Sequence, residues 1–145
     1  MTARCAVPAD ASQLAELNEF LREFWRAAEL EPAWLGSFEL ALEETFLNIV
    51  MHGSRPGSTP RVEVSLSLDA DVVTLTVEDD GPHFDPLSLP APDVTAGLGH
   101  RRVGGLGVHL VRNLMDAVSY ERTAGRNQLR MSKRGHLRAA RGKSA

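Results

Sequence analysis

Residues 41–53 read ALEETFLNIVMHG and place three polar side chains, Glu44, Asn48 and His52, four positions apart. An α-helix has about 3.6 residues per turn, so these three would lie nearly above one another on a single face. Most of the other residues in this stretch are apolar. A polar stripe on an otherwise buried helix costs free energy unless something pairs with it, so the stripe must face either water or a ligand.

Two helices are predicted in the first third of the chain. Residues 12–30 carry leucines and aromatic residues at spacings of three and four, which is typical of an amphipathic helix, and Ser12 is a candidate N-cap. Pro32 opens a second helix, because a proline in the first turn forfeits no helical hydrogen bond. This second helix contains the polar stripe and ends at Gly53.

The rest of the chain predicts strands with a third helix between them. The segments that read as strands are residues 61–69, 71–80, 117–122 and 127–133. A long proline-containing loop, 86–103, is followed by a glycine-rich helix start at 104–107. The economical packing for this order is a two-layer α/β sandwich, an α+β fold with helices on one face of a mainly antiparallel sheet.

The composition indicates one globular domain. A length of 145 residues fits one domain and requires no second. The chain is 43% hydrophobic and 24% charged, which is ordinary for a globular protein. No apolar run approaches the roughly 20 residues that span a bilayer, and the N-terminus lacks the apolar core of a signal peptide. Cys5 is the single cysteine and cannot form an internal disulfide. We therefore expect a cytoplasmic protein without a membrane partner.

The C-terminus is the most basic part of a chain whose net charge is -3. Residues 133–145 carry five basic side chains and no acidic one. Such a segment could contact nucleic acid or an acidic partner. Because it has no aromatic residue, we expect 134–145 to be a disordered tail without direct nucleic-acid binding, attached to a domain that spans 1–133.

An acidic residue stands where the second predicted strand gives way to a turn. Asp79 precedes Gly81, and a carboxylate there accepts hydrogen bonds only, which suits an amino group such as that of adenine. Gly81 would let a flat ring approach the backbone closely. The alternative is an ordinary Asp-Asp-Gly turn, which the segment alone favours.

A glycine-rich segment precedes the third helix. Its residues are Gly104, Gly105, Leu106 and Gly107. Exposed backbone N–H groups and the positive end of a helix together bind phosphate. Arg101 and Arg102 lie just upstream and could neutralise a terminal phosphate, or could belong to a solvated charged loop. The segment is neither a Walker A loop nor a Rossmann fingerprint.

The polar stripe offers groups for phosphoryl chemistry. The amide oxygen of Asn48, with phosphate oxygens, suits Mg²⁺. Glu44 near the same metal could deprotonate a hydroxyl nucleophile. His52, beside the helix end, is interpreted as a capping or structural residue. Glu43 points about 100° away from Glu44 and ranks below it.

In this order the three segments resemble the N, G1 and G2 boxes of the GHKL ATPase superfamily, which includes DNA gyrase and the histidine kinases. Within it the chain looks most like the bacterial anti-sigma-factor serine/threonine kinases. The similarity is carried by ALEETFLNIVMHG (41–53), VEDDGPHFDP (77–86) and GGLGVHLVRNLMDAVSYER (104–122), with Asn127-Gln-Leu in a closing strand. It covers about residues 5–133.

The resemblance implies a Bergerat fold that binds ATP and Mg²⁺, and a role for each matching residue. Asn48 would coordinate Mg²⁺, Glu44 would be the general base, and Asp79 would bind the adenine amine beside Gly81. The backbone at 104–107 would bind phosphates, and 86–103 would be the ATP lid. His83 stands where the superfamily often has a second glycine, so the Pro82-His83 pair should stiffen the lid hinge.

The function implied is that of a protein serine kinase that also sequesters a sigma factor. Such relatives phosphorylate a serine of a STAS-type antagonist and thereby switch partners, often as homodimers. One alternative is a non-catalytic, nucleotide-dependent binding module, which the altered G1 segment motivates. A weaker alternative is an orphan kinase-type domain of a phosphorelay.

Overall fold

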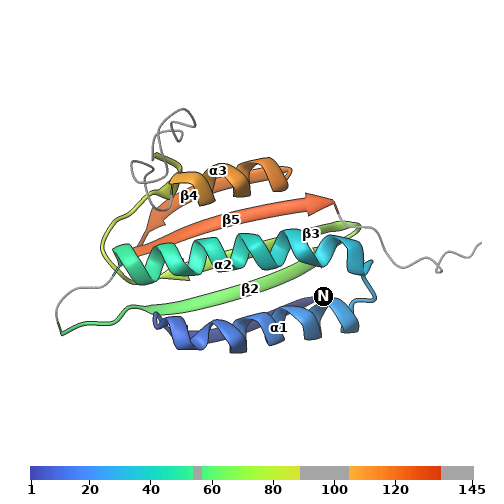
Figure 1. Ribbon diagram of the computed structural model, residues 1–145, viewed down its shortest axis with the longest axis horizontal. Helices are drawn as coiled ribbons and strands as arrows, with labels where there is room; N and C mark the ends of the chain where they lie inside the picture. The colour runs from blue at the N-terminus through green and yellow to red at the C-terminus, as the bar shows by residue number, and fades with distance from the viewer. Residues whose placement is uncertain (54–56, 89–104, 135–145) are drawn as a thin grey trace, which may run out of the picture.

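A computed structural model describes residues 1–53, 57–88 and 105–134. Three helices pack against one face of a five-stranded sheet (Figure 1). The longer elements are β1 (Thr2–Pro8), α1 (Leu14–Ala27), α2 (Leu35–His52), β2 (Arg61–Asp69), β3 (Val72–Asp79), α3 (Gly105–Leu114), β4 (Ala117–Thr123) and β5 (Arg126–Arg134). A short 3-10 turn precedes α1 (Ala11–Gln13), another precedes α2 (Pro32–Trp34), and a third follows β3 (Pro86–Ser88).

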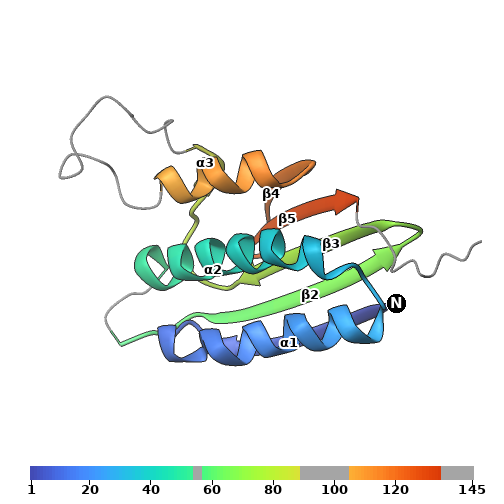
Figure 2. The same ribbon diagram turned by 45° about the vertical axis from the view of Figure 1, so that its right-hand side comes forward.

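The sheet has the strand order β1-β2-β3-β5-β4, and every neighbouring pair is antiparallel. Alternate residues of β2 and β3 are buried, because side chains in a strand point to opposite faces. The buried face contacts the helices, as Figure 2 shows from a second side. This arrangement confirms the predicted α+β sandwich with helices on one face.

The structure adds one strand that the sequence pattern did not predict. β1 pairs along its whole length with β2 at an edge of the sheet. Its inward residues are Ala3, Cys5 and Val7, and only Val7 is fully buried. Because two of the three are small, the segment lacks the strong apolar alternation that predicts a strand.

The start of the first helix also differs from the prediction. Asp10, rather than Ser12, caps the turn before α1: its Oδ1 accepts a hydrogen bond of 2.9 Å from the Ser12 backbone N–H. An N-cap side chain ordinarily accepts a hydrogen bond from a backbone N–H two or three residues later, which has no partner within the helix. Hydrogen bonding to the backbone lowers the pKa of Asp10.

α2 is the central helix and carries both apolar and polar residues toward the sheet. Its apolar residues fill the core, and the Phe38 ring lies 5.1 Å from that of Trp25 on α1. Thr45 and Asn48 are buried on the same helix. Buried polar side chains require partners or a ligand. Among the described residues no helix has the length and apolar character that crossing a membrane requires.

Candidate functional site

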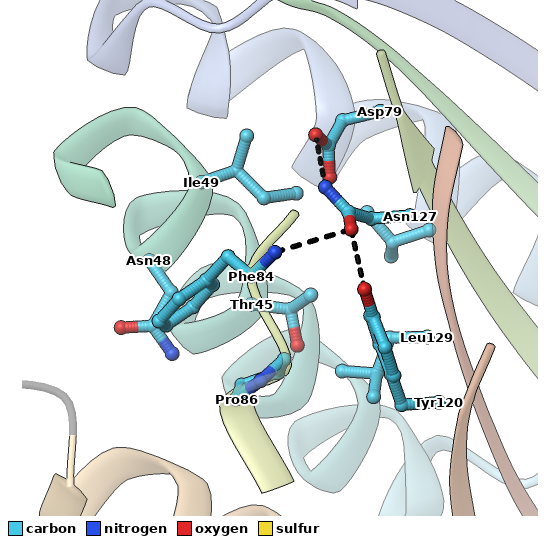
Figure 3. Close-up of a pocket in the computed structure, with 10 residues that line it drawn as sticks. Thr45, Asn48, Ile49, Asp79, Phe84, Pro86, Tyr120, Asn127 and Leu129 are labelled. Atoms are coloured by element: carbon cyan, nitrogen blue, oxygen red, sulfur yellow. Dashed lines mark hydrogen bonds between the residues drawn. The ribbon is translucent and has the colours of Figure 1, made fainter. Parts of the chain in front are cut away.

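A small pocket lies between α2 and the adjoining ends of β3, β4 and β5 (Figure 3). Its walls come from segments far apart in the chain. They are Thr45, Asn48, Ile49, Val77, Asp79, Phe84, Pro86, Tyr120, Asn127 and Leu129. Two of the polar residues that the sequence singled out, Asn48 and Asp79, therefore line one cavity.

Asp79 is the last residue of β3 and is held by two neighbours. It is only 5% exposed. Its Oδ1 accepts hydrogen bonds from the Gly81 backbone N–H at 2.9 Å and from Asn127 Nδ2 at 3.0 Å. Because Asp79 occupies an inward position of the strand, its carboxylate faces the pocket rather than solvent.

Gly81 is tightly enclosed. A β-carbon there would lie 3.0 Å from Asp79 Oδ1, 3.1 Å from the Gly53 carbonyl oxygen and 3.2 Å from a Pro60 ring carbon. Two of these neighbours belong to the backbone or a proline ring and give way poorly. A side chain at position 81 would therefore have to displace these neighbours by a few tenths of an ångström.

Glu44 lies one helical turn before Asn48 and contacts the start of α3. A second small pocket is lined by Glu44, Thr45, Asn48, Pro86, Leu87, Val108, Val111, Val118 and Leu129. A β-carbon added to Gly107 would come within 1.8 Å of Glu44 Oε1, so the carboxylate occupies the space beside that glycine. Burial, with a smaller contribution from the charge of Glu43, raises the pKa of Glu44.

The two pockets adjoin each other, because four residues line both. They share Thr45, Asn48, Pro86 and Leu129. Their volumes are about 20 Å³ and about 10 Å³. A cavity of this size holds about one water molecule, so neither accommodates a nucleotide in this conformation. We expect the Pro86 turn, which lines both pockets, to shift when a nucleotide binds.

A larger polar cavity of about 290 Å³ is lined by Gly81 and its neighbours. Its walls are Gly53, Ser58, Thr59, Pro60, Asp80, Gly81, Pro82 and Arg122. Asp80 and Arg122 bring opposite charges to it. Size alone would favour this cavity, but it contains neither Asn48 nor Asp79, so we place the candidate site in the pocket that does.

His52, the third member of the stripe, lines neither small pocket. It is exposed at the end of α2, and its ring stacks on Phe84 at 4.7 Å. This agrees with a structural role. His83, the departure from the superfamily pattern, lies edge-on to the Tyr120 ring at 5.8 Å.

Several predicted binding residues lie outside the described part of the chain. They are Arg101, Arg102 and Gly104, with most of the loop 86–103. Gly105 and Leu106 form the first residues of α3. The roles assigned to all of these residues stay predictions.

The sequence pattern missed the role of Asn127. It was identified only as part of a closing strand, yet its amide lies at the centre of the pocket's hydrogen bonds. The available signal was an amide at an inward position of a strand whose next inward residues are Leu129 and Met131. Such a buried amide requires several partners.

The protein oxygens near Asn48 would hold Mg²⁺ only together with phosphate oxygens and water. No group of three or more His, Cys, Asp or Glu residues within the described ranges could hold a metal ion. Mg²⁺ commonly binds through one or two protein oxygens plus phosphates and water. The Asn48 amide oxygen, with Glu44 nearby, fits that pattern.

Residues 7–133 match the histidine kinase-like ATPase domain family. The chain belongs to this family, as the three sequence motifs indicated. It is 32% identical over 93 residues to the serine/threonine-protein kinase BtrW of Bordetella bronchiseptica; the match covers 64% of this chain and 66% of BtrW, just under two thirds of that relative.

The fold is similar to that of a solved structure from Mycobacterium tuberculosis. The crystal structure of the RsbU and RsbW domains of Rv1364c matches with a TM-score of 0.66 and 16% identity. The match covers 93% of this chain and 32% of that one. At this identity the likeness establishes the fold.

Proposed function

We propose that this chain is an ATP-dependent protein serine/threonine kinase that regulates a sigma factor in the cytoplasm. One observation carries the proposal. Glu44 and Asn48 lie one helical turn apart on α2, and Asn48 lines both the pocket that contains Glu44 and the pocket that contains Asp79. This order suits a bound purine triphosphate, because Glu44 and Asn48 would lie at its phosphates and Asp79 at its base.

Each residue has a role in holding the nucleotide. The Asp79 carboxylate accepts a hydrogen bond from the adenine amino group, with Gly81 beside the ring. Asn48 supplies a protein oxygen to Mg²⁺, which neutralises charge on the phosphates when it is bound. Backbone N–H groups at 104–107 bind the phosphates, with Arg101 and Arg102 as further cations.

Glu44 acts as the general base toward the acceptor serine. Its carboxylate takes the hydroxyl proton while the serine oxygen forms a bond to the γ-phosphorus. The bond between that phosphorus and the bridging oxygen breaks, and ADP leaves with the electron pair. Burial raises the pKa of Glu44 and so makes the carboxylate a stronger base than an exposed glutamate.

The partners we propose are a sigma factor and a STAS-type antagonist whose serine accepts the phosphate. The similarity to a protein named serine/threonine-protein kinase and to a domain named RsbW supports this choice. Phosphorylation of the antagonist would release it and leave the chain, as a homodimer, free to hold the sigma factor.

The test is phosphotransfer to a STAS protein encoded beside this chain. Mass spectrometry should detect phosphoserine after incubation with Mg²⁺ and ATP. Glu44→Gln should lower the rate by about 10²–10⁴-fold, because it removes the base. Glu43→Gln is the matched control and should transfer at close to the wild-type rate. Absence of phosphoserine, or equal rates for wild type and Glu44→Gln, would contradict the kinase proposal.

A second candidate is a nucleotide-dependent binding module without catalysis. Two observations favour it: the small volume of the pocket that contains Asp79, and His83 at the expected lid hinge. Calorimetry distinguishes the two, because a module binds nucleotide without phosphotransfer. Asp79→Asn should abolish nucleotide binding under either reading.

A further inference from the structure

The side-chain amide of Asn127 uses both of its protons inside the site. Asn127 Nδ2 donates to Asp79 Oδ1 at 3.0 Å and to the Pro82 carbonyl oxygen at 2.8 Å. Asn127 is 5% exposed and pairs directly with Asp79 in the register of β3 and β5. One amide therefore joins the carboxylate at the end of β3 to the turn that follows it.

The amide oxygen faces three donors, which fixes the orientation of the group. Asn127 Oδ1 accepts from the Tyr120 hydroxyl at 2.5 Å, from Arg122 Nη1 at 3.1 Å and from the Phe84 backbone N–H at 3.3 Å. A guanidinium and a backbone N–H donate only. Exchanging the oxygen and nitrogen of the amide would therefore set donors against donors.

The fixed amide determines which oxygen of Asp79 is free for a ligand. Both hydrogen bonds that Asp79 accepts from described residues end on Oδ1. Oδ2 accepts no hydrogen bond from a described residue, and Asp79 lines the pocket, so this oxygen is available to a ligand. An ionised carboxylate accepts hydrogen bonds and donates none. Such a group binds a 6-amino purine and rejects a 6-oxo purine.

We propose that Asn127 is a positioning residue that sets the base selectivity of the nucleotide site by holding Asp79 and the Gly81–Phe84 turn in one arrangement. The inference rests on the nucleotide-binding function proposed above. Asn127 makes no contact with the base itself, because both of its protons and its oxygen are already bonded. Its effect passes through Asp79.

The test is calorimetric binding of ATP and of inosine triphosphate, which carries a 6-oxo group, both with Mg²⁺. The wild-type chain should bind ATP more tightly. Asn127→Asp keeps the shape and the acceptor oxygen but places an acceptor against Asp79 Oδ1 and the Pro82 carbonyl. It should weaken ATP binding by about tenfold or more, while binding of inosine triphosphate changes by less than about threefold.

Asn113→Asp serves as the control, because it makes the same chemical change at an exposed position of α3 and should behave as wild type. An equal fall in both affinities for Asn127→Asp, or an unchanged ratio, would overturn the proposal.

A wild-type chain that binds neither nucleotide contradicts the proposed function itself, and so differs from failure of the selectivity inference. Should Asn127→Asp not fold, the wild-type side-chain amide can be followed by NMR. Both Nδ2 protons should exchange slowly with solvent in the nucleotide-free chain. Rapid exchange of both protons in the folded protein would also overturn the proposal.

Discussion

Glu44 Oε1 occupies the place that a β-carbon on residue 107 would take, within 1.8 Å of its ideal position. The neighbour of Gly107 is thus the end of a flexible side chain rather than backbone. A methyl group at this position can be accommodated, but only by displacing the proposed base.

Gly107→Ala should therefore separate stability from activity. Alanine favours a helix over glycine by about 1 kcal/mol, so the melting temperature should stay the same or rise. Displacement of Glu44 should lower kcat for phosphotransfer by at least about tenfold. Gly36→Ala on α2 is the control, since a β-carbon there meets no atom within 4 Å. Normal kcat in Gly107→Ala would show that the position of Glu44 is unimportant.

The raised pKa of Glu44 predicts a pH-dependent stability. A carboxyl whose pKa is higher in the folded state stabilises the fold while protonated, and that contribution is lost as pH rises through the folded-state pKa. Glu44→Gln should unfold at a higher temperature than wild type at neutral pH, and the difference should vanish below the ordinary pKa of 4.5. Thermal unfolding followed by circular dichroism at several pH values tests this; a constant difference would refute it.

Pro86 lines both small pockets, so loosening its turn should favour nucleotide binding. The Pro86 turn is held by Leu87 N–H to Asp85 Oδ1 at 2.9 Å and by Arg112 Nη2 to the Leu87 carbonyl oxygen at 2.9 Å. The apparent affinity falls with the fraction of molecules in the open state. Pro86→Ala should therefore tighten ATP binding several-fold by calorimetry. Pro8→Ala on β1 is the control, and weaker binding in Pro86→Ala would argue against the shift.

Two turns contain alanine where glycine is favoured. Ala70, between β2 and β3, has φ 56°, and Ala124, between β4 and β5, has φ 54°. A residue with a β-carbon in the left-handed region destabilises the folded state by about 1–2 kcal/mol. Glycine avoids this strain but loses more backbone entropy on folding, which offsets part of the gain. Ala70→Gly should raise the free energy of unfolding by about 0.5–1 kcal/mol in urea titrations. Ala6→Gly, in β1, should lower it.

The fold was predictable because its main elements have strong local patterns. α2 follows from Pro32, the apolar positions and Gly53, and β2 and β3 alternate with large β-branched residues and leucines. β1 was missed because strand pairing, not residue size, stabilises it. Asp10 was missed as a cap because a 3-10 turn precedes α1.

The candidate site was only partly predictable. Glu44 and Asn48 share a helix, so their spacing alone places them together. Asp79 and Asn127 are 48 residues apart in sequence, and their contact depends on the register of β3 with β5, which no local pattern reveals. The position of Pro86 in the walls of both pockets likewise arises only from tertiary packing.

The hairpin at Ala70 and Asp71 joins the ends of β2 and β3 opposite to Asp79. Seven residue steps of strand separate Val72 from Asp79, or about 23 Å at the usual rise. A fluorophore attached to Asp71→Cys in a Cys5→Ala background would therefore lie far from Asp79 and leave the chemistry of the pocket untouched.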